Sequence, residues 1–368
     1  MRGIRLLPNA SRSRPGTSNT GERAYAYAKA CGIIGKSFIG KGIRRLHNLQ
    51  SLSELDRAVF PDSPRDLPEK ELLPDLEKRI TGRAVDSIIS IMGCFPAPPR
   101  FLALVVRGYE YSDLLAVLLA SQERESNAPA YTDIGRFQTV RFEKWPDIPA
   151  MIGGTEYSFL LDKNISGGLG NISLQTTMDR HYYTALWDAL SYLPGKGREI
   201  AGKILADEIS IKNATWALRL RSYYGMNGDE VKLHLVDIPL KGRKRLRSNP
   251  ATANLATANL ANDAIRCLDF PLDNHDSWSS WRWKALLNPD ERDGGPWRAN
   301  PRFFQNAASR YLFRQAKHYF HLNPFSLDSI YCFIKMKQFE EDVLTSNAEG
   351  LGMGMSGRDV ASLLGVES

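Results

Sequence analysis

Three segments of this sequence repeat apolar residues every three to four positions, which is the spacing of one face of an α-helix. In 204–224 the face consists of Leu205, Ile209, Asn213, Trp216 and Leu220. In 101–120 it consists of Leu102, Val106, Tyr109, Asp113 and Val117, and in 330–347 of Phe333, Met336, Glu340, Val343 and Asn347. We therefore predict three amphipathic helices, each with a polar residue on its apolar face.

The three segments can be placed in a common register. Asp113, Asn213 and Val343 then coincide, with Glu110, Ser210 and Glu340 three residues upstream. A repeat of about 100 residues predicts an all-α fold of three pseudo-symmetric helical domains. The predicted boundaries are 22–126, 127–228 and 229–368, after a disordered basic arm at 1–21; a loop region inserted at 241–300 lengthens the third domain.

The polar residues in the predicted faces need partners, because an unpaired buried polar group costs a few kcal/mol. Asp113 and Asn213 should either bond to the ends of neighbouring helices or line a groove that accepts a partner. Two further pieces, 138–142 and 231–236, alternate as short strands do, and we expect at most minor extended structure there.

The composition is that of a soluble globular protein, with 43% hydrophobic and 24% charged residues. Only 101–120 approaches the length of a membrane span, and its centre holds Arg107, Glu110 and Asp113. An Arg or Asp at the centre of a spanning helix costs about 2.5 to 3.5 kcal/mol. We therefore predict a soluble core helix there and no transmembrane segment.

The net charge of +7 suits an anionic partner. The most basic run contains Lys241, Arg243, Lys244, Arg245 and Arg247. Such a run can contact phosphates or anionic headgroups, or it can be a solvated loop. The tryptophan-rich piece 278–287 of the same region should pack against the rest of the protein.

No motif predicts catalysis, a metal or a cofactor. Gly35-Lys36-Ser37 resembles the end of a phosphate-binding loop, but Ala30 replaces the first glycine and a helix-forming segment precedes it. His318 and His321 lack a third ligand at metal-binding spacing. The four cysteines show no paired spacing, so we predict free thiols in a reducing compartment.

The segments 22–39, 207–226 and 323–356 resemble the C-subunit family of archaeal and bacterial V-type (A-type) rotary ATPases, whose eukaryotic counterpart is the d-subunit. In the central segment, Glu208, Asn213, Trp216 and Arg219 match the family pattern E-x-D-x-x-N-L-x-W-x-x-R. The sequence departs from the family at Ser210, Ala214, Gln338 and Val343.

The resemblance implies a funnel of three helical domains that joins the central shaft to the membrane rotor ring. Such an adaptor is non-catalytic, has no cofactor, and lies at the cytoplasmic face of the membrane, where it serves ATP synthesis or hydrolysis and transport of H⁺ or Na⁺. A rotational arrangement would bring corresponding helix positions together as a shaft-binding socket. We predict that the socket consists of Arg107, Glu110, Asp113, Glu208, Asn213, Arg219 and Glu340.

Two other functions compete with this interpretation. A basic helical protein that binds nucleic acid would explain the positive charge and the run at 241–247, although no aromatic residues interleave with its charges. A nucleotide-dependent enzyme would need Lys36 at a phosphate.

Overall fold

The computed structural model describes residues 20–123, 127–161, 170–239, 259–290 and 296–366. Within these ranges the regular structure is helical and no strand is formed, which confirms the all-α prediction. One isolated bridge joins Pro239 to Asn259. The basic run 241–247 and all but the last two residues of the predicted arm lie outside the described residues; those two, Thr20 and Gly21, already belong to the first helix.

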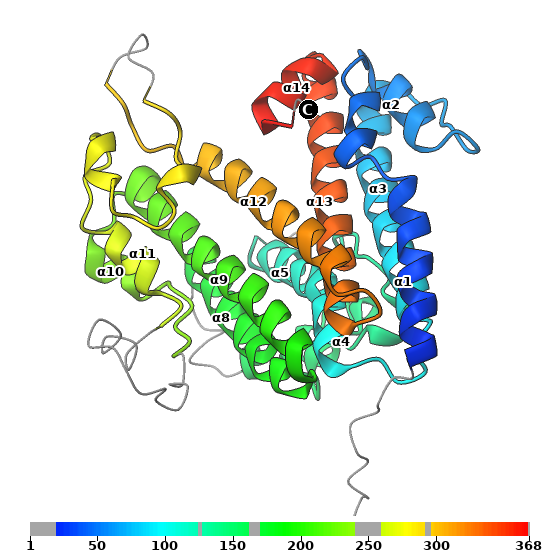
Figure 1. The fold of residues 1–368 in the computed structure, drawn as a ribbon, viewed down its shortest axis with the longest axis horizontal. Coiled ribbons are helices and arrows are strands. Elements are labelled where there is room, and N and C mark those ends of the chain that lie inside the picture. The colour runs from blue at the N-terminus through cyan, green and yellow to red at the C-terminus, as the bar shows by residue number, and fades with distance from the viewer. Residues whose placement is uncertain (1–19, 124–126, 162–169, 240–258, 291–295, 367–368) are drawn as a thin grey trace, which may run out of the picture.

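The α-helices follow one another along the chain with irregular connections and short 3-10 turns between them (Figure 1). They are α1 (Thr20–Gly35), α2 (Leu52–Val59), α3 (Glu69–Met92), α4 (Arg100–Val106), α5 (Gly108–Gln122), α6 (Ile148–Ile152), α8 (Asn171–Ala189), α9 (Gly195–Tyr224), α10 (Gly228–Lys232), α11 (Asn262–Cys267), α12 (Pro301–Leu322), α13 (Leu327–Gly352) and α14 (Gly357–Leu364). None of the helices in the described ranges combines the length and the low polarity needed to cross a bilayer.

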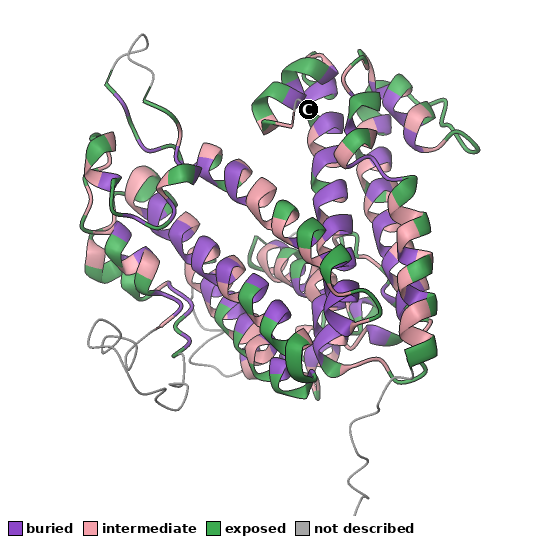
Figure 2. Cartoon of the chain, viewed as in Figure 1, coloured by how far each residue is buried: buried purple, intermediate pink, exposed green. Residues whose placement is uncertain are grey.

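The α13 helix is buried on most of its circumference. It packs against α3, α9 and α12, and also contacts α1, α2, α4 and α14 (Figures 1 and 2). Ser326 begins the helix by accepting the backbone N–H of Ser329 at 3.2 Å. A helix surrounded in this way must be apolar on several faces, and α13 buries Ile330, Phe333 and Met336 among others.

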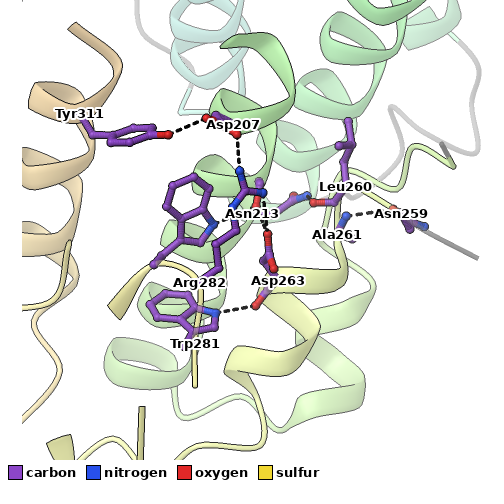
Figure 3. Close-up of polar contacts among 11 residues, drawn as sticks. Asp207, Asn213, Asn259, Leu260, Ala261, Asp263, Trp281, Arg282 and Tyr311 are labelled. Carbon is purple, nitrogen blue, oxygen red and sulfur yellow. Dashed lines mark hydrogen bonds and ion pairs between the residues drawn. The ribbon is translucent and has the colours of Figure 1, made fainter. Parts of the chain in front are cut away.

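The predicted apolar faces of α9 and α13 are buried at all five positions each. Asp207, which the periodicity places outside the buried face of α9, is also buried, because α12 and the chain around Arg282 cover that side. Its carboxylate accepts the Tyr311 hydroxyl at 2.7 Å and pairs with Arg282 at 2.5 Å (Figure 3). The helix α9 is therefore enclosed on two sides rather than one.

The predicted helix at 101–120 is interrupted at Arg107, where α4 ends and α5 begins. At Gly108 a side chain could not be accommodated without movement, since a Cβ there would lie 2.7 Å from the Tyr182 hydroxyl. Within α5, Glu110 is fully buried while Asp113 is only half-buried. Asp113 is thus less buried than its place in the predicted face implies, but it accepts the Thr132 N–H at 2.7 Å, as a polar residue on such a face requires.

Neither piece predicted to alternate forms a strand. Residues 138–142 are irregular up to a 3-10 turn at Phe142, and Val231 and Lys232 end α10. In the first piece the backbone N–H groups of Thr139 and Val140 bond to the buried carboxylate of Glu110 rather than to another strand.

The tryptophan-rich piece does pack, as predicted. Trp278, Trp281 and Trp283 are buried against the second half of α9, and each indole N–H donates a hydrogen bond. The Trp283 indole reaches the Ser210 hydroxyl at 3.0 Å, and that hydroxyl donates to Asp263 at 2.9 Å. The Asp263 carboxylate in turn forms an ion pair with the Arg282 guanidinium at 3.2 Å (Figure 3).

The largest apolar cluster combines residues far apart in the chain. Side chains from α1, α3 and α4 pack there together with side chains from α13. The two ends of the described chain therefore share one core, and the division into three domains remains a prediction.

A buried ion pair lies at the centre of this core. Lys337 and Glu340, both at most 2% exposed, form a salt bridge within α13, and Arg83 lies 4.0 Å from the same carboxylate. Glu340 also accepts the backbone N–H of Phe38 at 2.7 Å. Burial alone would raise the pKa of Glu340, but Lys337, the Phe38 N–H and Arg83 together hold it below its ordinary value.

Replacing Glu340 with Ala should lower the free energy of unfolding by about 3 to 5 kcal/mol, because it leaves a buried lysine without a counter-charge. Chemical denaturation measures this loss. In the control K337M/E340L both charges are removed together, and this variant should be less destabilised than E340A. A loss below about 1 kcal/mol in E340A would contradict the structural role of the pair.

Candidate functional site

A polar cleft lies between α5, α8, α9, α12 and α13. Its main part has a volume of about 580 Å³, and a second hollow of about 380 Å³ continues from it between α12 and α13 toward α14. The two parts share Thr81, Ser309, Phe339, Glu341 and Asp342. We call both parts together the central cleft.

Acidic groups outnumber basic groups in the main part of the cleft. The walls contain five carboxylates, from Asp113, Asp179, Glu208, Glu341 and Asp342, and two lysines, Lys212 and Lys335.

Both lysines form ion pairs with carboxylates of the cleft wall. Lys212 lies 3.2 Å from Asp179, and Lys335 lies 2.8 Å from Glu208. Glu208 also accepts hydrogen bonds from the hydroxyls of Tyr183 and Tyr331. These contacts leave Asp113, Glu341 and Asp342 without an ion pair among the described residues.

The three remaining carboxylates are difficult to ionise together. Burial raises the pKa of Asp113 to about 6, and the nearby Glu110 adds to the rise, although the Thr132 N–H at 2.7 Å opposes it. Burial raises the pKa of Glu341 as well, against the opposing bond from the Tyr109 hydroxyl at 2.6 Å. The surrounding protein and the neighbouring Glu341 raise the pKa of Asp342, although its side chain keeps contact with solvent and Lys335 opposes the rise.

Asp342 is nevertheless accessible to solvent within the cleft. Its carboxylate therefore stands on a concave wall, where surrounding protein limits hydration but does not block approach. Holding these carboxylates close together costs free energy, and folding has already supplied it. A cationic group that entered the cleft would therefore meet carboxylates that need no further rearrangement. The arrangement is suited to binding a positively charged segment.

Two of the seven predicted socket residues, Asp113 and Glu208, line the central cleft. Arg107 and Glu110 lie behind it and hold the chain that follows α5. Arg107 donates to the Phe137 carbonyl at 2.9 Å and pairs with Glu156 at 3.3 Å. Glu110 accepts the backbone N–H of Val140 at 2.6 Å.

The other three predicted residues lie elsewhere. The buried amide of Asn213 accepts the backbone N–H of Val236 at 2.7 Å and donates to the carbonyl of the same residue at 2.9 Å. Arg219 is exposed, with its guanidinium 5.8 Å from the ring centre of Trp216. Glu340 belongs to the buried ion pair of the core. The structure therefore does not bring all seven side chains together.

Two of the three positions that coincide in the predicted register make a similar contact, while the register itself remains a prediction. Glu110 and Glu340, which coincide in that register, both accept backbone N–H groups from irregular segments packed beside their helices. At the third equivalent position, Ser210, the nearest carboxylate belongs to Asp263 and reaches the position through the serine hydroxyl.

Sequence reasoning missed Glu341 and Asp342. Successive residues on a helix point about 100° apart, so the run Glu340-Glu341-Asp342 cannot face one environment. The first of the three faces the core and the other two face the cleft. Three adjacent acids on a helix with a buried face are a signal that could have identified them.

The motifs weighed for other chemistry make contacts within the protein; the His321 imidazole, for example, lies 3.3 Å from the Tyr27 hydroxyl. Gly35-Lys36-Ser37 follows the C-terminal end of α1, and the Ser37 hydroxyl donates to the Ile33 carbonyl at 3.2 Å. A phosphate-binding loop would instead precede a helix. His318 and His321 are exposed on α12, and the described ranges hold no group of three or more metal-ligating side chains. None of the four cysteines forms a disulfide.

The fold and the cleft define a helical binding scaffold, and comparison with known proteins gives its family. The profile of the ATP synthase (C/AC39) subunit family matches residues 63–361. The chain belongs to this family of V/A-type ATPase subunits, which are non-catalytic, and the resemblance predicted from the sequence is confirmed.

One similar sequence spans almost the same length. It is an uncharacterized protein of Treponema pallidum (strain Nichols), 24% identical over 334 residues, which cover 90% of this chain and 92% of the relative.

The variant D113N should be more stable than the wild type at pH 8, by up to about 3 kcal/mol, and of equal stability near pH 4. The pKa of Asp113 is higher in the folded than in the unfolded chain, so the folded state binds this proton more tightly. Stability is therefore lost as the pH rises through about 6. Denaturation at several pH values measures the difference.

The control for this prediction is D62N, which changes an exposed carboxylate in the loop before α3. It should leave the pH dependence of stability unchanged. A parallel pH profile for D113N and the wild type would show that Asp113 titrates normally.

Proposed function

We propose that this protein is the central-rotor adaptor of a V/A-type rotary ATPase, which links the central shaft to the membrane rotor ring. In this role it transmits torque between ATP turnover and the transport of H⁺ or Na⁺, at the cytoplasmic face of the membrane. The observation that carries the proposal is the central cleft, an acidic cavity within a helical scaffold of the C/AC39 family.

The size and the charge of the cleft are the reasons for proposing the shaft as its occupant. Its two parts extend along α13 from Lys335 to Glu349, a rise of about 20 Å. This length accepts the end of a helix or a helical hairpin. The carboxylates of Asp113, Glu341 and Asp342 have no ion pair among the described residues, so the entering end should carry Lys or Arg side chains.

The helices behind the cleft are suited to carry load. Both α9 and α13 exceed 25 residues, and each is held by buried polar contacts as well as by apolar packing. Because close-packed interiors have low compressibility and transmit strain, force applied at the cleft would reach the other end of these helices with little deformation.

The first experiment is co-purification of the tagged protein from solubilised membranes. The proposal expects the shaft and rotor-ring subunits in the eluate. Their absence under conditions that keep the rest of the ATPase assembled would refute it.

The charge reversal E341K/D342K should weaken binding to purified shaft subunits by more than tenfold, or about 1.4 kcal/mol, because it replaces attraction by repulsion. Calorimetric titration gives the affinity, and circular dichroism checks that the helix content is unchanged. The matched control D62K/D66K makes the same charge change on the exposed loop before α3. Equal affinities of the cleft variant and the wild type would place the shaft elsewhere.

A further inference from the structure

Three helices of this fold begin at the same end of the molecule. Phe101 near the start of α4 lies against Tyr331 near the start of α13, with ring centres 5.0 Å apart. The start of α9 also abuts the start of α13, where a Cβ on Gly197 would lie 2.9 Å from the Asp328 carboxylate. In Figure 1 these helix starts lie along the lower edge.

Exposed aromatic, aliphatic and basic side chains gather at this end. Tyr192, Leu322 and Phe325 are 52%, 54% and 48% exposed, and Arg100 and Lys196 are exposed beside them. The Arg100 guanidinium lies 5.6 Å from the ring centre of Tyr192. We call these five residues the helix-start surface.

The backbone at Phe325 is unusual. Its φ of 61° lies in the left-handed region, which residues other than glycine, asparagine and aspartate seldom occupy. The connection between α12 and α13 thus holds a large, half-exposed apolar ring in a conformation that favours glycine. Packing is one reason for this conformation, since the ring centres of Phe325 and Tyr27 lie 5.4 Å apart. About half of the Phe325 surface nevertheless faces outward.

Exposed basic groups outnumber exposed acids around the surface, because Arg198 is exposed there as well as Arg100 and Lys196. The exposed acids nearby are Asp188 and Glu199, while the Asp328 carboxylate is buried and receives the Asn323 amide at 3.1 Å. The chain also enters α1 at this end, about 10 Å beyond Tyr27.

We propose that the helix-start surface binds the anionic headgroups of a phospholipid membrane. Rings and aliphatic groups beside Arg and Lys match the two layers of a membrane interface, since the basic groups meet phosphates while the apolar groups enter the boundary with the acyl chains. Glu208 lies 12 residues along α9 from Lys196, a rise of about 18 Å, so the cleft and this surface can be occupied at the same time.

The test is co-sedimentation of the full-length protein with vesicles of phosphatidylcholine alone or of equal parts phosphatidylcholine and phosphatidylglycerol. The wild type should bind the anionic vesicles, more weakly as salt increases, and bind the neutral ones at least tenfold less tightly. The variant R100E/K196E should lose at least tenfold in affinity for anionic vesicles, because basic groups near such a surface each contribute about fivefold.

The matched control R57E/K70E reverses two exposed charges in α2 and at the start of α3, whereas the end of α3 leads toward the helix-start surface. It should stay within about twofold of the wild type. A second variant, Y192S/F325G, should weaken binding at high salt, and glycine at 325 suits the backbone there, so the fold is retained.

Three results would overturn the proposal: no binding of the wild type to anionic vesicles, equal binding to neutral vesicles, or equal losses in R100E/K196E and R57E/K70E. If R100E/K196E instead lost the rotor-ring subunits in co-purification with vesicle binding unchanged, the surface would contact protein. Shaft binding at the cleft is measured separately, so either proposal can fail without the other.

Discussion

Enclosing α13 on nearly every side is the constraint on which the rest of the structure depends. Most polar side chains on a buried helix must find partners within the protein, since each unpaired one costs free energy. Lys337 and Glu340 do so through their salt bridge and the backbone of Phe38, and Tyr331 does so through Glu208. These bonds tie α13 to the segment after α1 and to α9, so the same contacts that permit its burial also fix the walls of the cleft.

The carboxylates of the central cleft differ from those of the core in their pairing. Where the core pairs its carboxylates, the cleft leaves three of them without an ion pair among the described residues and with raised pKa values. An isolated chain gains no stability from this arrangement, since like charges in a poorly hydrated cavity repel. Unneutralised charge on a rigid wall is instead what a complementary partner can use.

Periodicity in the sequence was sufficient to find α9 and α13 and their buried faces, because the apolar positions of a helix repeat whatever the partner is. It could not find the interruption at Arg107, where Gly108 lies close to Tyr182 of another helix. The burial of Asp207 was likewise hidden, since its partners Tyr311 and Arg282 are distant in the sequence. Of the predicted site, Asp113 and Glu208 do lie beside the cleft, while Glu341 and Asp342 required knowledge of which way α13 is turned.

The packing of α1 beside α13 has a consequence for how the protein is made. These helices come from opposite ends of the chain, and Phe38 meets Glu340 across 302 positions. A nascent chain that has released α1, α3 and α4 from the ribosome has apolar faces whose partner is not yet synthesised. Contacts of such long sequence separation form slowly, and exposed apolar surface favours aggregation in the meantime. The core can close only after α13 has emerged, so folding during synthesis should depend on factors that shield α1, α3 and α4 until then.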